Sequence, residues 1–89
     1  MTRDEKIAKW MGFPEHQPAP DYSADPAAFL ELRKKLLADG WVITAESLVT
    51  SSGVVAWIEK GELGYQGEGF TEPEALAMAV ERMLEDRTK

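Results

Sequence analysis

Apolar residues recur at a helical spacing near the N-terminus, where Ile7, Trp10 and Met11 fall on one face of a helix. A T-x-x-E capping box at residues 2–5 begins this stretch, and Gly12 follows it as a residue that readily ends a helix. The pattern predicts a helix over residues 1–12. Because a helix this short is marginal alone, its apolar face must pack on another part of the chain.

Two further stretches show the same period. Residues 25–40 have Asp25 as the N-cap, Pro26 at the first helical position and Gly40 just past the end, which is the usual placement of these residue types. Residues 71–84 begin with a second T-x-x-E box. The apolar faces of these two predicted helices comprise Phe29, Leu32 and Leu36 in the first, and Leu76, Val80, Met83 and Leu84 in the second.

Residues 13–24 (FPEHQPAPDYSA) separate the first two predicted helices. Their three prolines exclude a helix interior and a central strand. We predict a semi-extended connector that is long enough to cross from one face of a small domain to the other. The expected organisation is a single domain, with an N-terminal helix (1–12), a proline-rich connector (13–24) and an α-β-β-β-α core (25–89).

Three short stretches rich in β-branched and aromatic residues precede the last predicted helix: WVITAESL (41–48), VVAWIE (54–59) and LGYQGEGF (63–70). Between them, S-S-G at 51–53 and K-G-E at 60–62 predict tight turns. Because antiparallel strands can be joined by such short connections, the three strands should form an antiparallel meander.

Alternation along these strands predicts two different sheet faces. One face is apolar and comprises Trp41, Ile43, Val54, Ala56 and Ile58. The other is mixed and comprises Val42, Thr44, Glu46, Val55, Trp57 and Glu59. We predict that the last two helices cover the apolar face, and that the N-terminal helix covers the mixed face with Trp10 near Trp57. The expected fold is α+β, in the order helix-helix-strand-strand-strand-helix, arranged as an α/β/α sandwich.

Composition and charge limit the classes of function. The 89 residues carry a formal net charge of −6, of which −5 falls in residues 41–89. Phosphate backbones bind through Lys and Arg, so direct binding to duplex nucleic acid is not expected. With no Cys and a single His (His16), disulfide scaffolds and thiolate or multi-His metal sites are excluded. The sequence shows neither a membrane-span pattern nor a signal-peptide pattern, so we expect a cytoplasmic location.

The glycines of the third predicted strand, Gly64, Gly67 and Gly69, precede a helix, as the glycines of a phosphate cradle do. However, Glu72 and Glu74 occupy the first turn of that helix and would repel phosphate. We therefore interpret the glycines as places where the strand bends or bulges against a helix. No carboxylate pair and no Ser, His or Cys motif has catalytic spacing, so we expect no enzyme activity, no cofactor and no metal.

Acidic and aromatic residues of the second half are the candidates for a binding surface, because Trp and Tyr dominate many interface hot spots. The predicted partner-binding residues are Glu46, Trp57, Glu59, Tyr65, Glu68, Glu72 and Glu74. Two interpretations of Trp57 and Tyr65 stay open: packing within the chain, or exposure as binding anchors. The Arg33-Lys34-Lys35 cluster is either a solvated helix face or a site for an acidic partner or a nucleotide.

Three segments spread along the chain, IAKWMGF, PDYSADPAAFLELRKKL and EPEALAMAVERML, resemble the phage ABA sandwich domain, a family of small bacteriophage and prophage proteins. The longer proline connector and the acidic second half depart from that family. The resemblance implies a phage origin and a sandwich fold, for a family without an established activity. The core order also resembles the double-stranded RNA-binding fold, but that fold has a basic cluster where this chain has Glu72 and Glu74.

These features predict a small non-enzymatic bacteriophage protein that acts by binding in the cytoplasm of a bacterial host. The function we favour is an anti-defence or host-takeover inhibitor, such as an anti-CRISPR, that docks an acidic surface on a host protein or protein complex. The alternatives are a sponge for a small nucleotide signal and a phage structural or packaging accessory protein. We expect a monomer or a symmetric homodimer that binds no membrane.

Overall fold

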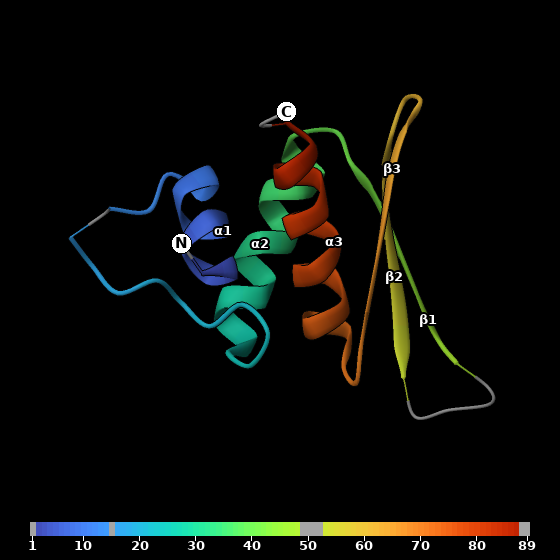
Figure 1. Ribbon diagram of the computed structural model, residues 1–89, viewed down its shortest axis with the longest axis horizontal. Coiled ribbons are helices and arrows are strands. Elements are labelled where there is room, and N and C mark those ends of the chain that lie inside the picture. Colours follow the sequence, from blue (N-terminus) through green and yellow to red (C-terminus); the bar gives the residue numbers. More distant parts are fainter. Residues whose placement is uncertain (1, 15, 49–52, 88–89) are drawn as a thin grey trace.

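In the computed structural model, which describes residues 2–14, 16–48 and 53–87, three helices lie on one side of a three-stranded sheet (Figure 1). The elements are α1 (Arg3–Met11), α2 (Pro26–Ala38), β1 (Val42–Ser47), β2 (Val54–Lys60), β3 (Leu63–Gly69) and α3 (Glu72–Arg87). The predicted α+β class and the order α-α-β-β-β-α are therefore confirmed.

The helices begin and end where their capping residues stand. The Thr2 side chain accepts a hydrogen bond from the Glu5 N–H, and the Glu5 carboxylate accepts one from the Thr2 N–H, so the predicted capping box of α1 is complete. Gly12 ends α1 in the left-handed conformation, with φ 82°. Asp25 caps α2, and the Thr71 hydroxyl accepts a backbone N–H in the first turn of α3.

The strands form an antiparallel sheet in the order β1-β2-β3, as the short connections predict. The register aligns Thr44 with Trp57 on β2, and Trp57 with Gln66 on β3. Beyond the end of β1, the Leu48 N–H donates to the Gly53 carbonyl at 2.9 Å, which extends the pairing toward the first turn. Residues 51 and 52 of that predicted turn lie outside the described residues.

The apolar face predicted for the sheet is the face that α2 and α3 cover, and we call it the inner face. Trp41, Ala56 and Ile58 are buried there, and Ile43 and Val54 are partly buried. The helices contribute a further set of buried residues: Ala28, Leu32 and Leu36 from α2, and Ala75, Leu76, Ala77, Ala79, Val80 and Met83 from α3. Burial of these side chains is the main favourable contribution to the stability of the domain.

Helix α3 approaches β3 closely because Gly67 has no side chain. A Cβ at this position would lie 2.1 Å from the Ala75 carbonyl oxygen and 2.4 Å from the Ala79 nitrogen. A Cβ at Gly69 would lie 2.8 Å from the Glu74 side chain. These two glycines of β3 therefore allow α3 to pack closely on the strand. The predicted bulge does not occur, because β3 pairs with β2 in an unbroken register.

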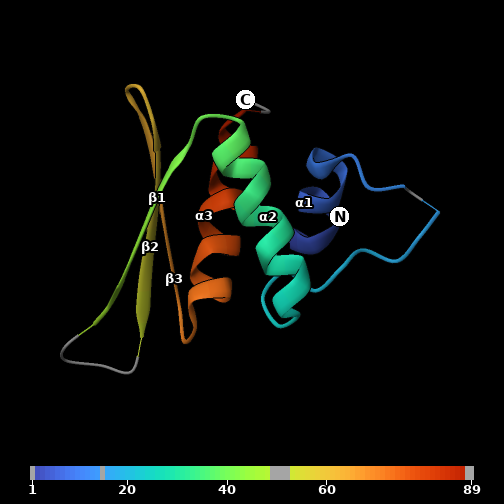
Figure 2. The ribbon, with the colours of Figure 1, turned by 180° about the vertical axis from the view of Figure 1, so that it is seen from behind.

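The predicted place of α1 is wrong, and with it the α/β/α sandwich. Helix α1 packs on α3, on the side of the helix layer that faces away from the sheet (Figures 1 and 2). Ile7 is fully buried in this packing. Lys6 Nζ lies 3.7 Å from a carboxylate oxygen of Glu81 and 3.4 Å from one of Glu85, both on α3.

Trp10 consequently lies beside α2 and not near Trp57: the Lys35 Nζ is 5.4 Å from the centroid of the Trp10 ring. The connector loops outward and returns on the helix side (Figure 2). The physical reason is that the helix layer offers α1 both a site that buries Ile7 and acidic partners for Lys6. On the mixed sheet face Val55 is already buried without α1, so that face offers α1 less apolar surface to cover.

Candidate functional site

The sheet face opposite the helices, which we call the outer face, is left uncovered, since the described helices all lie on the other side (Figures 1 and 2). Its residues form three rows across the strands. The rows are Val42-Glu59-Gly64, Thr44-Trp57-Gln66 and Glu46-Val55-Glu68. Trp57 thus stands at the centre of a face whose borders carry three carboxylates.

Hydrogen bonds hold Trp57 in place on the outer face. Its indole N–H donates to Gln66 Oε1 at 3.1 Å, and Gln66 Nε2 donates to a carboxylate oxygen of Glu68 at 3.5 Å. Arg82 reaches this network from α3: its guanidinium lies 3.6 Å from the Glu68 carboxylate and donates to the Gln66 carbonyl. These hydrogen bonds fix the orientation of the Trp57 ring, and a fixed ring would lower the entropic cost of any binding to it.

A hollow of about 310 Å³ lies beside Trp57, at the end of the sheet where β2 turns into β3. The residues that line it include Trp57, Glu59, Glu62 and Tyr65. A Cβ at Gly64 would make only an ordinary contact with Glu59 Cγ, at 3.9 Å. Within the described ranges, neither Glu59 nor Glu62 forms an ion pair.

An aromatic face next to unpaired carboxylates is the chemistry that binds a guanidinium or an ammonium group. A cation over an indole ring gains about 0.5–2 kcal/mol, depending on how far it is desolvated. A carboxylate adds charge-assisted hydrogen bonds to the same cation. No group of three or more residues suited to hold a metal occurs in the part of the chain that the structure describes.

The structure brings four of the seven predicted site residues together on the outer face: Glu46, Trp57, Glu59 and Glu68. Tyr65 points to the inner face, where its ring centroid lies 6.0 Å from that of Trp41. Its hydroxyl donates to the Asp86 carboxylate, and this hydrogen bond raises the pKa of Tyr65. The Tyr65 side chain therefore packs against Trp41 and α3, although Tyr65 is also among the residues that line the hollow beside Trp57.

The other two predicted residues, Glu72 and Glu74, lie at the start of α3, away from the outer face. The Glu72 carboxylate is 3.6 Å from the Arg33 guanidinium, so this pair joins α3 to α2. The Glu74 side chain packs beside Gly69. Both residues thus contact other parts of the chain.

Three further members of the site, Glu62, Gly64 and Gln66, are not among the residues predicted from the sequence. Gly64 and Gln66 follow from the hairpin register, which sets them opposite Glu59 and Trp57. The alternation pattern and the K-G-E turn contain this signal. Glu62 lies in the turn itself, and only the folded turn brings its carboxylate into the same hollow as Glu59.

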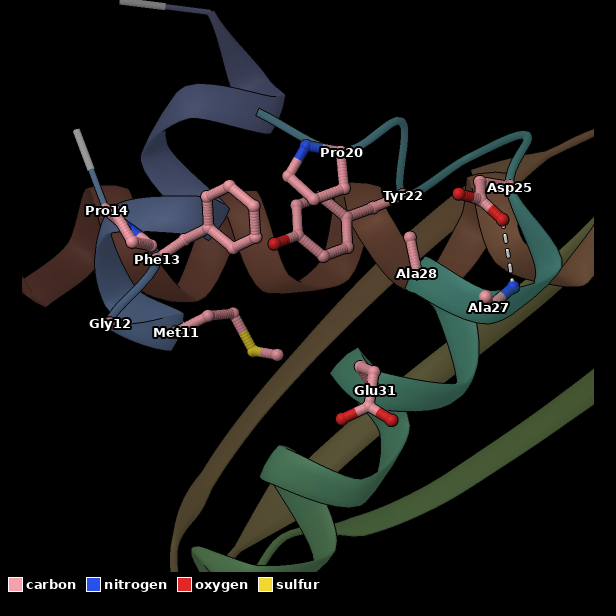
Figure 3. Close-up of a pocket in the computed structure, with 10 residues that line it drawn as sticks. All are labelled: Met11, Gly12, Phe13, Pro14, Pro20, Tyr22, Asp25, Ala27, Ala28 and Glu31. Carbon is pink, nitrogen blue, oxygen red and sulfur yellow. Dashed lines mark hydrogen bonds between the residues drawn. The ribbon is translucent and has the colours of Figure 1, made fainter. Parts of the chain in front are cut away.

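A second hollow, of about 420 Å³, lies between the end of α1 and the first turns of α2 (Figure 3). Met11, Phe13 and Tyr22 give it an apolar wall, and burial raises the pKa of the Tyr22 hydroxyl. Its two acids already have partners. Asp25 accepts the N–H of Ala27, and Glu31 lies 3.6 Å from Lys34 Nζ.

The second hollow therefore lacks the unpaired charge of the hollow beside Trp57. An apolar wall alone does not select an occupant, whereas the outer face combines an orientated aromatic ring with free carboxylates. For this reason we take the outer face as the candidate functional site.

Comparison of the chain with family models, with curated proteins and with solved structures finds no match in any of the three. The resemblance to the phage ABA sandwich family therefore stays a prediction. Among the described residues, no helix is long and apolar enough to cross a membrane.

Proposed function

We propose that the protein acts by binding a partner protein, and that its outer face docks on a basic surface of that partner. The observation that carries this proposal is the hollow in which the Trp57 ring stands beside the unpaired carboxylates of Glu59 and Glu62. An Arg or Lys side chain of the partner would lie over the indole ring and pair with these carboxylates. Trp residues with surrounding polar groups are typical centres of protein interfaces.

The wider charge distribution supports a basic partner. Glu46 and Glu68 extend the acidic character along the outer face, and the whole chain carries a net charge of −6. Complementary charge accelerates association and selects against acidic partners. Because Glu68 is already 3.6 Å from Arg82, the stronger attraction comes from Glu46, Glu59 and Glu62.

The predicted phage relationship supports a narrower form of the same function. A bacterial complex that binds nucleic acid does so through Lys and Arg side chains. An acidic face with a partly exposed aromatic ring would compete with the phosphate backbone for those side chains. In this form the protein is an anti-defence or host-takeover inhibitor, such as an anti-CRISPR, whose partner is a nucleic-acid-binding host protein.

The test is capture of partners from a bacterial lysate, followed by affinity measurement with the purified partner. The Glu59→Gln/Glu62→Gln variant removes two charges from the hollow, and Glu31→Gln/Glu72→Gln removes two charges elsewhere. We expect the first variant, and Trp57→Ala, to bind about tenfold or more weakly, as loss of a hot-spot contact does. The control variant should bind like the unmodified protein.

Glu72 belongs to the residues predicted from the sequence, so the control also tests that alternative. Equal loss of affinity in the two double variants would mean that only net charge matters and would contradict docking through the hollow. A partner that binds the Trp57→Ala protein with unchanged affinity would also contradict the proposal.

A further inference from the structure

The two edges of the sheet differ in how their backbone groups are satisfied. At the edge formed by β3, the Gln66 carbonyl accepts from the Arg82 guanidinium, and the Glu68 N–H donates to the Met78 sulfur at 3.5 Å. Both Arg82 and Met78 belong to α3, so this helix covers the edge of β3. The opposite edge, formed by β1, has no such cover among the described residues.

The hydrogen-bond pattern identifies which groups of β1 face its free edge. The Leu48 N–H donates to the Gly53 carbonyl across the hairpin. Since the backbone groups of alternate residues in an antiparallel strand point to the same side, the even-numbered residues of β1 face β2. Ile43, Ala45 and Ser47 therefore direct their N–H and C=O groups outward, and no described residue pairs with them.

Strand β1 has few of the features that usually prevent pairing at an edge, and its one charged residue is Glu46. Edge strands are commonly protected by proline, lysine, a bulge or extreme shortness. The residues Val42–Ser47 (VITAES) contain no proline or lysine, and each pairs with a single residue of β2 in an unbroken register. Val42 is 62% exposed and Leu48 is 42% exposed, so two apolar side chains flank the free edge.

We propose that the edge of β1 pairs with β1 of a second copy of this chain, antiparallel and about a two-fold axis at Ala45. In this register Ile43 stands opposite Ser47 of the second copy, so all three outward residues find partners. If the register between the two copies is shifted by two residues in either direction, one of these three outward residues has no partner. The two sheets join into one sheet of six strands, through an isologous interface.

Side chains support this register over its neighbours. It places Val42 opposite Leu48 of the second copy on both sides of the axis, so that each of these exposed apolar side chains covers the other. It places Thr44 opposite Glu46, so no two carboxylates meet directly. This self-pairing uses the edge of β1 and is independent of the proposed docking through the hollow beside Trp57.

Sedimentation of the full chain over a wide concentration range tests the pairing. The unmodified protein should show a concentration-dependent dimer. Ala45→Pro removes an outward N–H, which an edge strand tolerates, and should give a monomer at every concentration. Ala45→Val keeps that N–H and should dimerise like the unmodified protein. An unmodified protein that stays monomeric throughout, or equal dimerisation of the two variants, would overturn the proposal.

A cross-linking experiment tests the register without relying on the proline variant. The chain has no Cys, so Ala45→Cys and Thr44→Cys each introduce a single thiol. In the proposed dimer, residue 45 faces its own copy at a Cα separation of about 5.5 Å, within the range of a disulfide. Residue 44 lies diagonally from its copy and on the other face. Mild oxidation should therefore link the Ala45→Cys protein rapidly and the Thr44→Cys protein slowly, and equal rates would refute this register.

Discussion

On the inner face of the sheet, α2 and α3 bury Trp41, Ala56 and Ile58, whereas on the outer face of the same strands Trp57 stands among carboxylates without a covering layer. The inner tryptophan is 4% exposed and its indole N–H donates to Asp39. The indole N–H of the outer tryptophan donates to Gln66, and its ring borders a hollow. The same residue type therefore closes the core on one face and forms part of a candidate binding surface on the other.

The glycines of β3 show the same contrast. Gly67 faces α3 so closely that a Cβ would overlap the helix backbone, while a Cβ at Gly64 would make only an ordinary contact at 3.9 Å. Close packing requires a missing side chain in the first case and not in the second. The role of a glycine in a strand therefore depends on which face it occupies.

The largest expected effect comes from a methyl group added on the inner face. Gly67→Ala should reduce the free energy of unfolding by about 3 kcal/mol or more, because α3 must move away from β3 to admit the Cβ. Gly64→Ala, in the same strand, should change it by less than about 0.5 kcal/mol. Urea unfolding of the two variants measures both values. Similar losses of unfolding free energy would contradict the difference in packing between the two faces.

A neighbouring pair on α2 tests the helix layer. Leu36 is fully buried and Leu37 is 53% exposed. Leu36→Ala should cost about 2–5 kcal/mol through lost burial and the cavity left behind. Leu37→Ala should cost less than about 1 kcal/mol, because half of its surface is already in water. Thermal unfolding followed by circular dichroism compares the two, and an unchanged melting temperature for Leu36→Ala would show that α2 does not cover the sheet as described.

The place of α1 gives a third test. Ile7→Ala should cost about 2–3 kcal/mol, because Ile7 is fully buried in the packing of α1 on α3. The nuclear magnetic resonance signal of the Trp57 indole N–H should stay where it is in this variant. A shift of that signal as large as the shift of the Trp10 signal would mean that α1 reaches the outer face after all.

The smallest expected effect concerns an acid on the helix side. The Ser23 hydroxyl donates to the Asp21 carboxylate at 2.8 Å, and this hydrogen bond is the main cause that lowers the pKa of Asp21. The folded protein thus binds that proton less readily than the unfolded chain. The resulting stabilisation is present above the ordinary carboxyl pKa and is lost as the pH falls through the lowered value.

Ser23→Ala should therefore move the pKa of Asp21 back toward its ordinary value and make the unfolding free energy slightly less dependent on pH in that acidic range. Carboxyl titration by nuclear magnetic resonance measures the pKa directly. A value for Asp21 that is unchanged by the substitution would show that this hydrogen bond does not form in solution.

Local patterns of the sequence were sufficient to predict the helices, the strands and the residues of the inner face. The capping residues Thr2 and Asp25, the helical spacing of Leu32 and Leu36, and alternation along β2 each depend on near neighbours. The place of α1 depends instead on distant partners: Lys6 meets Glu81 and Glu85, which lie more than seventy residues further along the chain. No local pattern distinguishes that contact from one with the carboxylates of the outer face.

The candidate site could likewise be predicted only where it depends on local alternation. Alternation places Glu46, Trp57 and Glu59 on one face, and the structure agrees. Tyr65 also lies in a strand, but the register sets it opposite Ile58, so its side chain lies on the inner face. Glu62 belongs to the site because the turn between β2 and β3 brings it close to Glu59. Residue spacing along the chain does not predict the shape of that turn.

The most direct test of the account is a titration of the isotope-labelled protein with an arginine-rich peptide, followed by nuclear magnetic resonance. The three tryptophans give three indole N–H signals, which Trp10→Phe, Trp41→Phe and Trp57→Phe variants assign. Docking through the outer face predicts that the Trp57 signal and the backbone signals of Glu62 and Gly64 shift, while those of Trp10 and Trp41 do not. Shifts confined to the start of α3 around Glu72 and Glu74, or no shifts at low salt, would contradict the claim that the outer face binds a basic partner.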